Sequence, residues 1–280
     1  MHWLTSRFSI DLSQPRVMGI VNVTPDSFSD GGQHAAAAAA IAHCQRLVDE
    51  GADILDIGGE STSPGSDAPG VAHELARVLP VLHEAVKLGV PVSVDTSEPR
   101  VMQEALALGV DIINDVRALR RPGALKIVAA HHRVGVCLMH MKGEPDTMQS
   151  LADYGDVVDE VRHFLDQRAQ DLQAAGVAAE RIVLDPGIGF AKTAEHNWLL
   201  LRRQAELAVL GRPLLLGWSR KSALGQLTGR PVGQRLAASV AAALAAVHNG
   251  AAIVRVHDVA ATVDALNVWK AAGLSAPPAG

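Results

Sequence analysis

A set of polar and charged residues recurs at one kind of place in this sequence, the end of a short apolar segment. In chain order the set comprises Asn22, Asp56, Asp95, Asn114, His140, Asp185, Lys221, Arg255 and His257. Any one of them has an ordinary structural explanation, since Asp95 could cap a helix and Asn114 could close a turn. Burying all of them would be costly unless they meet a ligand or one another. The set therefore predicts a binding site assembled from the whole length of the chain.

Two residues near the C-terminus have the chemistry to hold an anion. Arg255 and His257 are two positions apart in the segment IVRVH, so in a strand both side chains point to one side. Asn22 ends the strand that would lie beside them if the sheet closes into a barrel. A guanidinium, an imidazole and an amide together suit a phosphate or a metal-bound phosphate.

A second group has the chemistry to bind a flat heterocycle. Asp95, Asn114 and Asp185 offer acceptors and an amide, which complement a ring with several N–H donors. Lys221 could donate to a ring carbonyl, and a pteridine or a purine has this pattern of groups. Apolar cover for the ring faces would come from Ile20, Met139 and Phe190.

A repeating strand–helix pattern positions these residues. Eight apolar segments are predicted as strands, at 17–23, 54–57, 92–95, 112–114, 134–139, 182–185, 214–217 and 253–256. Helices are predicted at 35–50, 71–88, 100–108, 123–131, 154–175, 193–207, 234–249 and 259–272. This alternation indicates an α/β fold with a parallel sheet, and eight units indicate a closed (β/α)8 TIM barrel. A doubly wound open sheet is the alternative.

The chain is expected to form one domain over residues 1–280, because no Pro/Gly-rich linker divides it. Residues 1–16 are expected to form a small lid strand pair, and residues 274–280 a loose tail. The strand-to-helix connections at 24–34, 58–69 and 140–153 are much longer than the helix-to-strand connections. This asymmetry places the binding site at the carboxyl ends of the strands.

The composition excludes several classes of function. The net charge of -5 carries no basic stripe, and one Tyr and four Phe give no row of stacking platforms, so no nucleic-acid binding is expected. The longest apolar run, 236–247, is too short to span a bilayer, and residues 1–7 lack a signal peptide's apolar core. We therefore expect a cytoplasmic protein without membrane contact. Cys44 and Cys137 lie in apolar segments without CxxC spacing, which favours buried thiols.

Eight motifs in order give the sequence a resemblance to a known family. They are MGIVNVTPDSFSDGG, DIGGESTSPGS, SVDTS, INDV, MHMKG, VLDPGIGF, WSRKS and RVHDV. Along nearly its whole length the chain resembles the dihydropteroate synthases. The resemblance implies a (β/α)8 enzyme of folate biosynthesis and a sulfonamide target. Such an enzyme joins 6-hydroxymethyl-7,8-dihydropterin pyrophosphate to p-aminobenzoate and releases pyrophosphate, with Mg2+ as cofactor.

The resemblance also implies a role for each site residue. The pterin site maps to Asp95, Asn114, Met139, Asp185, Phe190 and Lys221. The pyrophosphate site maps to Asn22, Arg255 and His257, with Asn22 also toward the metal. The p-aminobenzoate site maps to Phe28, Thr62, Pro64, Phe190, Lys221 and Ser222. Catalysis is expected to depend on Asp95, Asp185, Lys221 and Arg255.

One position departs from the family pattern. After GEST at 59–62 the family usually has Arg, and this chain has Ser63, which removes a cationic contact near the second substrate. The departure keeps open a non-catalytic paralogue that only binds pterins. A pterin-dependent methyltransferase domain is the other alternative, against which the SRKS, RVHDV and TPDSFSDGG segments argue. The small-residue surface at 237–246 suggests a homodimer.

Overall fold

Eight parallel strands form a closed barrel in the computed structural model, which describes residues 1–23, 33–60 and 70–274. The barrel strands are β3 (Arg16–Asn22), β4 (Ile54–Gly58), β5 (Val92–Asp95), β6 (Ile112–Asp115), β7 (Gly135–Met139), β8 (Ile182–Asp185), β9 (Leu214–Leu216) and β10 (Ala251–Val256). Chain neighbours pair in parallel, and β10 pairs with β3 to close the ring. The predicted (β/α)8 barrel is confirmed, and every predicted strand is present with small differences at its ends.

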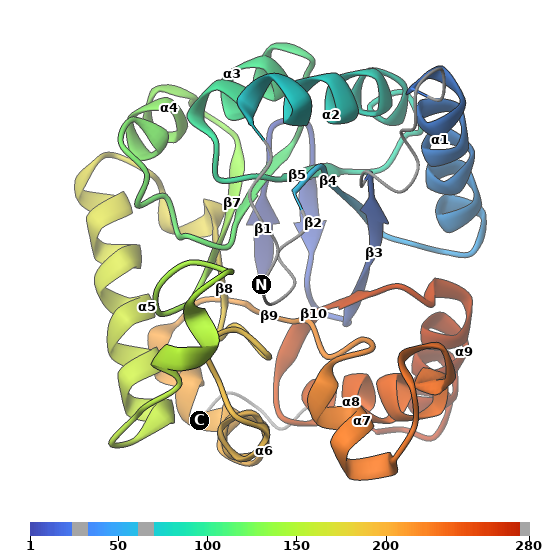
Figure 1. The fold of residues 1–280 in the computed structure, drawn as a ribbon, viewed down its shortest axis with the longest axis vertical. Coiled ribbons are helices and arrows are strands. Elements are labelled where there is room, and N and C mark those ends of the chain that lie inside the picture. Colours follow the sequence, from blue (N-terminus) through green and yellow to red (C-terminus); the bar gives the residue numbers. More distant parts are fainter. Residues whose placement is uncertain (24–32, 61–69, 275–280) are drawn as a thin grey trace.

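A ring of helices surrounds the strands, in chain order (Figure 1). The α-helices in the described part are α1 (Gln33–Asp49), α2 (Val71–Ala85), α3 (Pro99–Ala107), α4 (Ala124–Ala130), α5 (Val157–Ala174), α6 (Ala194–Arg202), α7 (Ser222–Thr228), α8 (Leu236–His248) and α9 (Val259–Ala271). Only α7 was not predicted. Its seven residues include Gly225 and are followed by Gly229 with a φ of 67°, so the segment gives a weak helical signal in the sequence.

Two predicted helices differ from the structure at their ends. The predicted helix at 154–175 begins at Val157, because the Asp156 side chain accepts hydrogen bonds from the N–H groups of Val158 and Asp159 and caps the helix there. The predicted helix at 193–207 is α6 followed by a separate 3-10 helix, Gln204–Leu210. Shorter 3-10 helices occur at Met148–Leu151, Ala179–Arg181 and Val232–Gln234.

The barrel interior changes from apolar to polar along the strands. All five residues of β4 are buried, and they alternate between two environments. Leu55 and Ile57 belong to the core between the strands and the helices, whereas Ile54 belongs to a separate cluster of residues from the starts of the strands. Asp56 comes two residues after Ile54, so its side chain points to the same side of β4, closer to the carboxyl end of the strand. Polar side chains therefore enter the barrel from that end.

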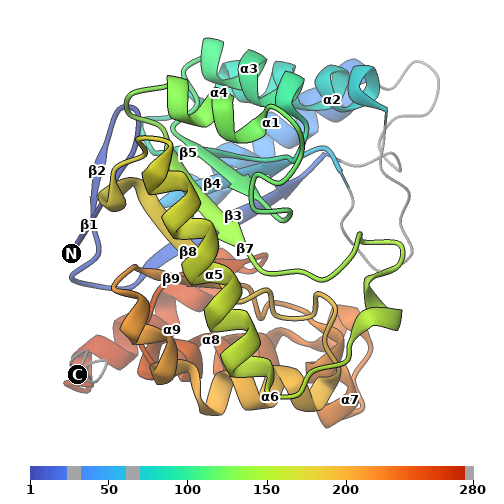
Figure 2. The ribbon, with the colours of Figure 1, turned by 90° about the vertical axis from the view of Figure 1, so that its left-hand side faces the viewer.

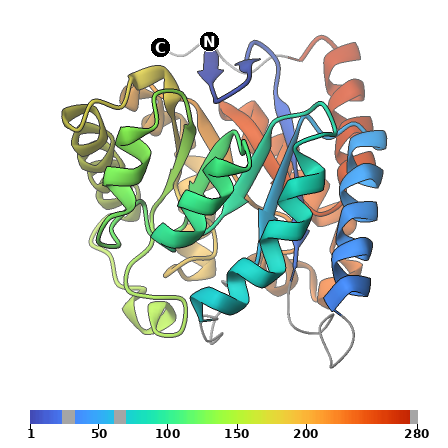
Figure 3. The same cartoon turned by 90° about the horizontal axis from the view of Figure 1, so that it is seen from above.

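The N-terminal strands β1 (His2–Leu4) and β2 (Ser9–Asp11) form an antiparallel pair, as predicted. The pair lies at one end of the barrel (Figures 2 and 3). Trp3 is fully buried there among the first residues of the barrel strands, and its ring N–H donates to the Arg181 carbonyl at 2.9 Å. Gly135 permits this contact, since a Cβ there would lie 3.1 Å from the Trp3 ring nitrogen. The expected lid therefore closes the amino end, away from the polar strand ends.

Two further expectations concern the cysteines and membrane-spanning segments. Cys44 and Cys137 are buried free thiols, as expected. In the described parts of the chain, no helix has both the length and the apolar character needed to cross a membrane.

Candidate active site

A cavity of about 400 Å³ opens at the carboxyl end of the barrel. The predicted residues that line it are Asn22, Asp95, Asn114, Met139, Asp185, Phe190, Lys221, Ser222, Arg255 and His257. Ile20, predicted as apolar cover, lines it as well, whereas Asp56 and His140 of the strand-end set do not. The other three predicted binding residues, Phe28, Thr62 and Pro64, lie outside the described residues, as does Ser63. We call this space the active-site cavity.

Arg255 joins the two predicted halves of the site. Its Nε donates to Asp56 Oδ2 at 2.6 Å, and its Nη2 donates to Asp95 Oδ2 at 2.9 Å. Asn114 Nδ2 donates to the same Asp56 oxygen at 3.0 Å. Asp56 itself is fully buried and does not line the cavity, although its strand-end position suggested that it would. It therefore supports Arg255 and Asn114 from beneath.

The carboxyl groups of the pterin set lie in surroundings that disfavour charge. Burial raises the pKa of Asp185 to about 6, although the Gly187 N–H donates to its Oδ1 at 2.7 Å and favours the charged form. Burial also raises the pKa of Asp95, which the Arg255 guanidinium opposes and the Asp56 carboxylate reinforces. N–H donors of a ligand would replace the missing solvent, so both groups are suited to accept hydrogen bonds from one.

Lys221 and Phe190 form one side of the cavity. The Lys221 Nζ lies 4.2 Å from the centre of the Phe190 ring, within the range of a cation–π interaction. Burial and the nearby Arg255 lower the pKa of Lys221 to about 8. Gly189 permits this arrangement, because its φ is +82° and a Cβ there would lie 2.9 Å from Lys221 Cδ. A planar ligand could contact the ring with its face and Lys221 with its edge.

His257 is a neutral donor in this structure. Burial, followed by the Arg220 and Arg255 guanidinium groups, lowers the pKa of His257 to about 4. The Ser219 Oγ accepts the backbone N–H of His257 at 3.2 Å and lies 2.9 Å from its Nδ1. When the Ser219 hydroxyl donates to Nδ1, the ring proton of neutral His257 lies on Nε2. His257 can thus donate one hydrogen bond to an anion before it carries a charge.

Glu60 and Ser219 are among the cavity residues that sequence reasoning missed. Glu60 is buried in the cavity lining, and Ser219 lines the cavity while holding His257. Both stand inside quoted motifs, DIGGESTSPGS and WSRKS, next to residues that were predicted. Their position in those motifs was the only available signal, because neither ends an apolar strand.

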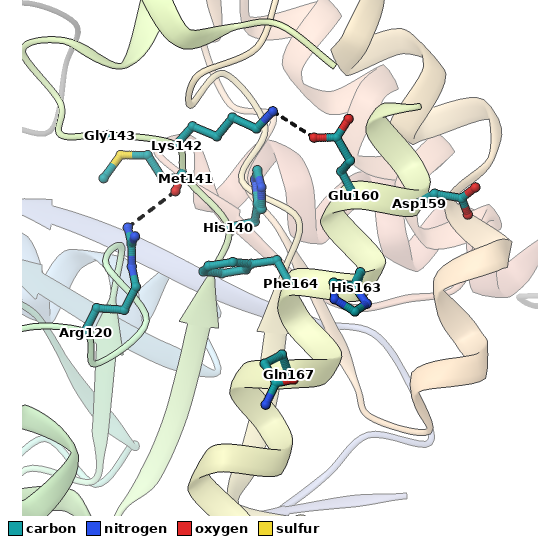
Figure 4. Close-up of a pocket in the computed structure, with 10 residues that line it drawn as sticks. All are labelled: Arg120, His140, Met141, Lys142, Gly143, Asp159, Glu160, His163, Phe164 and Gln167. Carbon is teal, nitrogen blue, oxygen red and sulfur yellow. Dashed lines mark hydrogen bonds and ion pairs between the residues drawn. The ribbon is translucent and has the colours of Figure 1, made fainter. Parts of the chain in front are cut away.

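His140 faces away from the active-site cavity, contrary to the strand-end pattern. Its Nδ1 lies 3.0 Å from the Lys192 Nζ, and its ring packs edge-on against Phe164. It borders a second cavity of about 690 Å³ between α5 and the segment after β7 (Figure 4). Two of the charged groups there, Lys142 and Glu160, pair with each other at 2.8 Å. His140 is the only member of the strand-end set among the residues that line this second cavity, whereas ten predicted substrate-binding residues line the smaller cavity, which is therefore the candidate active site.

The described residues offer few possible protein ligands for a metal ion. Among residues 1–23, 33–60 and 70–274, no group of three or more His, Cys, Asp or Glu side chains could hold a metal ion. Asn22 offers an exposed amide oxygen at the end of β3. Mg2+ bound to a phosphate ligand typically keeps several waters and takes only one or two protein oxygens. Asn22 therefore fits a Mg2+ ion that arrives with a pyrophosphate group.

Known proteins match this chain over nearly its whole length. The model of the pterin binding enzyme family matches residues 18–257. The chain is 54% identical over 279 residues to the dihydropteroate synthase of Neisseria meningitidis serogroup B, covering 98% of each protein. The chain belongs to the dihydropteroate synthase family. It is therefore an enzyme of folate biosynthesis that transfers an alkyl group other than methyl, as the resemblance implied.

Solved dihydropteroate synthases share the fold. The Xanthomonas albilineans enzyme, solved with 4-aminobenzoic acid, has a TM-score of 0.88 and 53% identity, with 95% of each chain covered. The Burkholderia cenocepacia enzyme, solved with 7,8-dihydropteroate, has a TM-score of 0.89 and 51% identity, with 97% of this chain and 96% of that chain covered. The methyltransferase alternative is set aside, since membership of the dihydropteroate synthase family accounts for nearly the whole chain.

Proposed function

We propose that the active-site cavity is where this dihydropteroate synthase condenses 6-hydroxymethyl-7,8-dihydropterin pyrophosphate with p-aminobenzoate to give 7,8-dihydropteroate and pyrophosphate. The assignment rests on one observation: the residues predicted to bind a heterocycle and those predicted to bind an anion line the same cavity. Acceptors for a heterocycle, Asp95 and Asp185, lie in the same space as the anion-binding residues Arg255 and His257. A substrate with a pterin at one end and a pyrophosphate at the other matches that arrangement.

The pterin ring is assigned to the inner part of the cavity. Asp95 and Asp185 would accept its N–H groups, Asn114 would hydrogen-bond its edge, and Lys221 would donate to its carbonyl. The Asn114 amide is already oriented by its bond to Asp56. Met139 and Phe190 line the cavity and supply apolar cover for the ring faces.

The pyrophosphate group is assigned to Asn22, Arg255 and His257. Arg255 carries a charge, since the Asp56 and Asp95 carboxylates overcome the effect of burial and raise its pKa. His257 donates from Nε2, and a bound pyrophosphate would raise its low pKa toward protonation. Mg2+, when bound, would neutralise negative charge on the pyrophosphate, with Asn22 supplying a protein oxygen.

The p-aminobenzoate is assigned to the mouth of the cavity. Phe190 offers an aromatic face there, and Lys221 and the exposed hydroxyl of Ser222 offer donors to a carboxylate. Phe28, Thr62 and Pro64 were predicted for the same site and stay predictions, because they lie outside the described residues.

The chemistry needs stabilisation of the leaving group more than a general base. The bond between the exocyclic carbon of the pterin and the pyrophosphate oxygen breaks, and its electron pair leaves with the pyrophosphate. The arylamine nitrogen supplies the pair for the new carbon–nitrogen bond and then loses a proton. An arylamine is already a nucleophile, so the Arg255 and His257 contacts to the leaving group should dominate the rate. Asp95 and Asp185 would favour positive charge that develops on the pterin.

Binding and turnover measurements test this assignment. Calorimetry with the pterin pyrophosphate should show binding that strengthens when Mg2+ is added, and adding p-aminobenzoate should then yield dihydropteroate. Binding of the pterin pyrophosphate without any turnover would instead support the non-catalytic paralogue that Ser63 keeps open. Absence of pterin binding would refute the assignment of the cavity.

We also propose that two copies associate through the surface near α7 and α8. Leu227, Val232 and Leu236 are large apolar side chains with 69%, 59% and 47% exposure on three consecutive elements. They precede the segment 237–246 that the sequence suggested, in which Ser239, Ala242, Ala243 and Ala246 are buried within the subunit. Light scattering should give the mass of a dimer, and Leu227→Glu should give that of a monomer. A cytoplasmic location stays a prediction from the sequence.

A further inference from the structure

Arg117 is a buried arginine with two carboxylate partners from different connections of the barrel. It follows β6, and its side chain is only 3% exposed. Its Nη1 and Nη2 donate to the two oxygens of Glu60 at 3.1 and 2.9 Å. Its Nε donates to Glu144 Oε2 at 2.5 Å, and its Nη1 also donates to Ser97 Oγ at 2.9 Å. Paired bonds of this kind fix a carboxylate in position and in plane.

Glu60 connects this cluster to the active site. Its side chain is buried in the cavity lining, two positions after the end of β4. The preceding residue, Gly59, is also fixed, because its carbonyl accepts a bond from Arg77 Nη1 at 2.9 Å. A Cβ at Gly59 would lie 2.8 Å from Val78 Cγ1, so the backbone packs closely on α2. The chain that leaves β4 therefore has a defined course up to Glu60, and Arg117 holds its last described side chain.

Glu144 gives Arg117 a second connection to the cavity. It lies in the segment between β7 and α5, and its carbonyl accepts the N–H of Met148 at 2.7 Å. Met148 is buried and lines the active-site cavity. Arg117 therefore contacts two cavity-lining segments that are far apart in the sequence, while it does not line the cavity itself.

We propose that Arg117 is a positioning residue of the condensation, which acts by holding Glu60 and, through Glu144, Met148 in the cavity lining. The inference rests on the proposed function, because the reaction that Arg117 would support is the condensation proposed above. The charge of Arg117 also compensates a buried carboxylate next to the pterin acids. Without it, Glu60 would be an unpaired buried anion, which is costly.

A double-mutant cycle separates positioning from plain stability. We expect Arg117→Met to lower kcat/KM for p-aminobenzoate by about ten- to a hundredfold, the range expected when a site is slightly misplaced. Adding Glu60→Gln to Arg117→Met should recover part of that loss, because the substitution removes the unpaired charge. Arg117→Lys keeps the charge but not the paired bonds, and should fall between Arg117→Met and the wild type.

Arg181 provides the matched control. It is also a buried arginine, but it lies at the amino end of the barrel and donates to the carbonyls of Val134 and Val128. Arg181→Met should lower the Tm and leave kcat/KM unchanged at a temperature where every variant is folded. A purely structural Arg117 would behave in the same way.

Two results would overturn the positioning role of Arg117. Wild-type kcat/KM in folded Arg117→Met, or a loss in the double variant equal to the sum of the two single losses, would overturn it. If the wild type binds the pterin pyrophosphate without turning it over, the proposed function fails. The role of Arg117 is then tested by measuring pterin pyrophosphate binding to the same variants by calorimetry. Weaker binding to Arg117→Met that Glu60→Gln partly restores would support positioning. Unchanged binding to Arg117→Met would refute it.

Discussion

The Arg255 guanidinium lies 2.9 Å from the Asp95 carboxylate, although β3 and β4 separate their two strands in the barrel wall. The same guanidinium bonds Asp56 on β4. In the structure, the cation expected to bind the pyrophosphate is thus paired with an acid expected to bind the pterin. The two ends of the substrate are therefore coupled through this ion pair, because a change at either partner alters the charge and the pKa of the other.

Replacing Arg255 tests this coupling. Arg255→Ala should weaken Mg2+-dependent pyrophosphate binding by roughly 2–5 kcal/mol, the usual cost of losing one partner of a buried charged hydrogen bond. It should also weaken binding of a bare pterin, although less, because loss of the guanidinium raises the pKa of Asp95 further. Calorimetry with each ligand measures both effects. An equal loss for the two ligands would mean that Arg255 is a pterin or structural residue.

Asp185→Asn should abolish pterin binding and yet stabilise the protein at neutral pH. The pKa of Asp185 is raised by burial to about 6, so the stability contributed by its protonated form is fully present below about pH 3.8 and is lost as the pH rises through about 6. A neutral Asn removes that cost and can still accept the Gly187 N–H. The free energy of unfolding should increase by roughly 1–3 kcal/mol near pH 7.5.

Denaturant unfolding of the wild type and Asp185→Asn at several pH values measures this difference. The two curves should converge as the pH is lowered below about 3.8, the ordinary pKa of an Asp carboxyl, because Asp185 is then protonated in both the folded and the unfolded state. A variant that is less stable than the wild type at neutral pH, or that keeps near wild-type pterin affinity, would contradict the assignment of Asp185 as a ligand-facing group.

Pterin binding should have a bell-shaped pH dependence. Affinity should fall below about pH 6, where Asp185 is protonated and can no longer accept two donors, and above about pH 8, where Lys221 loses its charge. Lys221→Arg should move the alkaline limb upward and leave the acid limb in place, because a guanidinium stays protonated. An alkaline limb that stays near pH 8 in this variant would assign it to another group.

Ser63→Arg should change the KM for p-aminobenzoate, or the rate, by no more than about tenfold, the equivalent of one interaction of roughly 1.4 kcal/mol. The reason is that Lys221, Arg255 and His257 line the active-site cavity, in which the proposed function places the leaving group. Steady-state kinetics of the wild type and the variant measure the change, and pterin affinity is the control that should not move. An inactive wild type that Ser63→Arg switches on would show that Ser63 silences the enzyme.

The sequence determined the barrel and the membership of its site. Strand–helix alternation is a local property, so eight short apolar segments predicted the eight barrel strands, and β3 to β10 occupy those segments. In a parallel barrel all strands end on the same face, so polar residues at those ends must gather there whatever the packing details. For this reason nine of the ten predicted residues that line the cavity could be named from their places near strand ends, whereas Ser222 came from the family resemblance.

The tertiary structure alone decided which of these residues meet and which turn away. Asp56 lies beneath the cavity, His140 contacts Lys192 behind it, and Arg255 pairs with Asp95 from a strand 160 positions away in sequence. Glu60 reaches the cavity lining with Arg117 as its partner, which no local pattern marks. The periodicity of a strand or helix determines the side from which each side chain projects. The partner that a long charged side chain reaches depends on burial and on charges brought close only when the barrel closes.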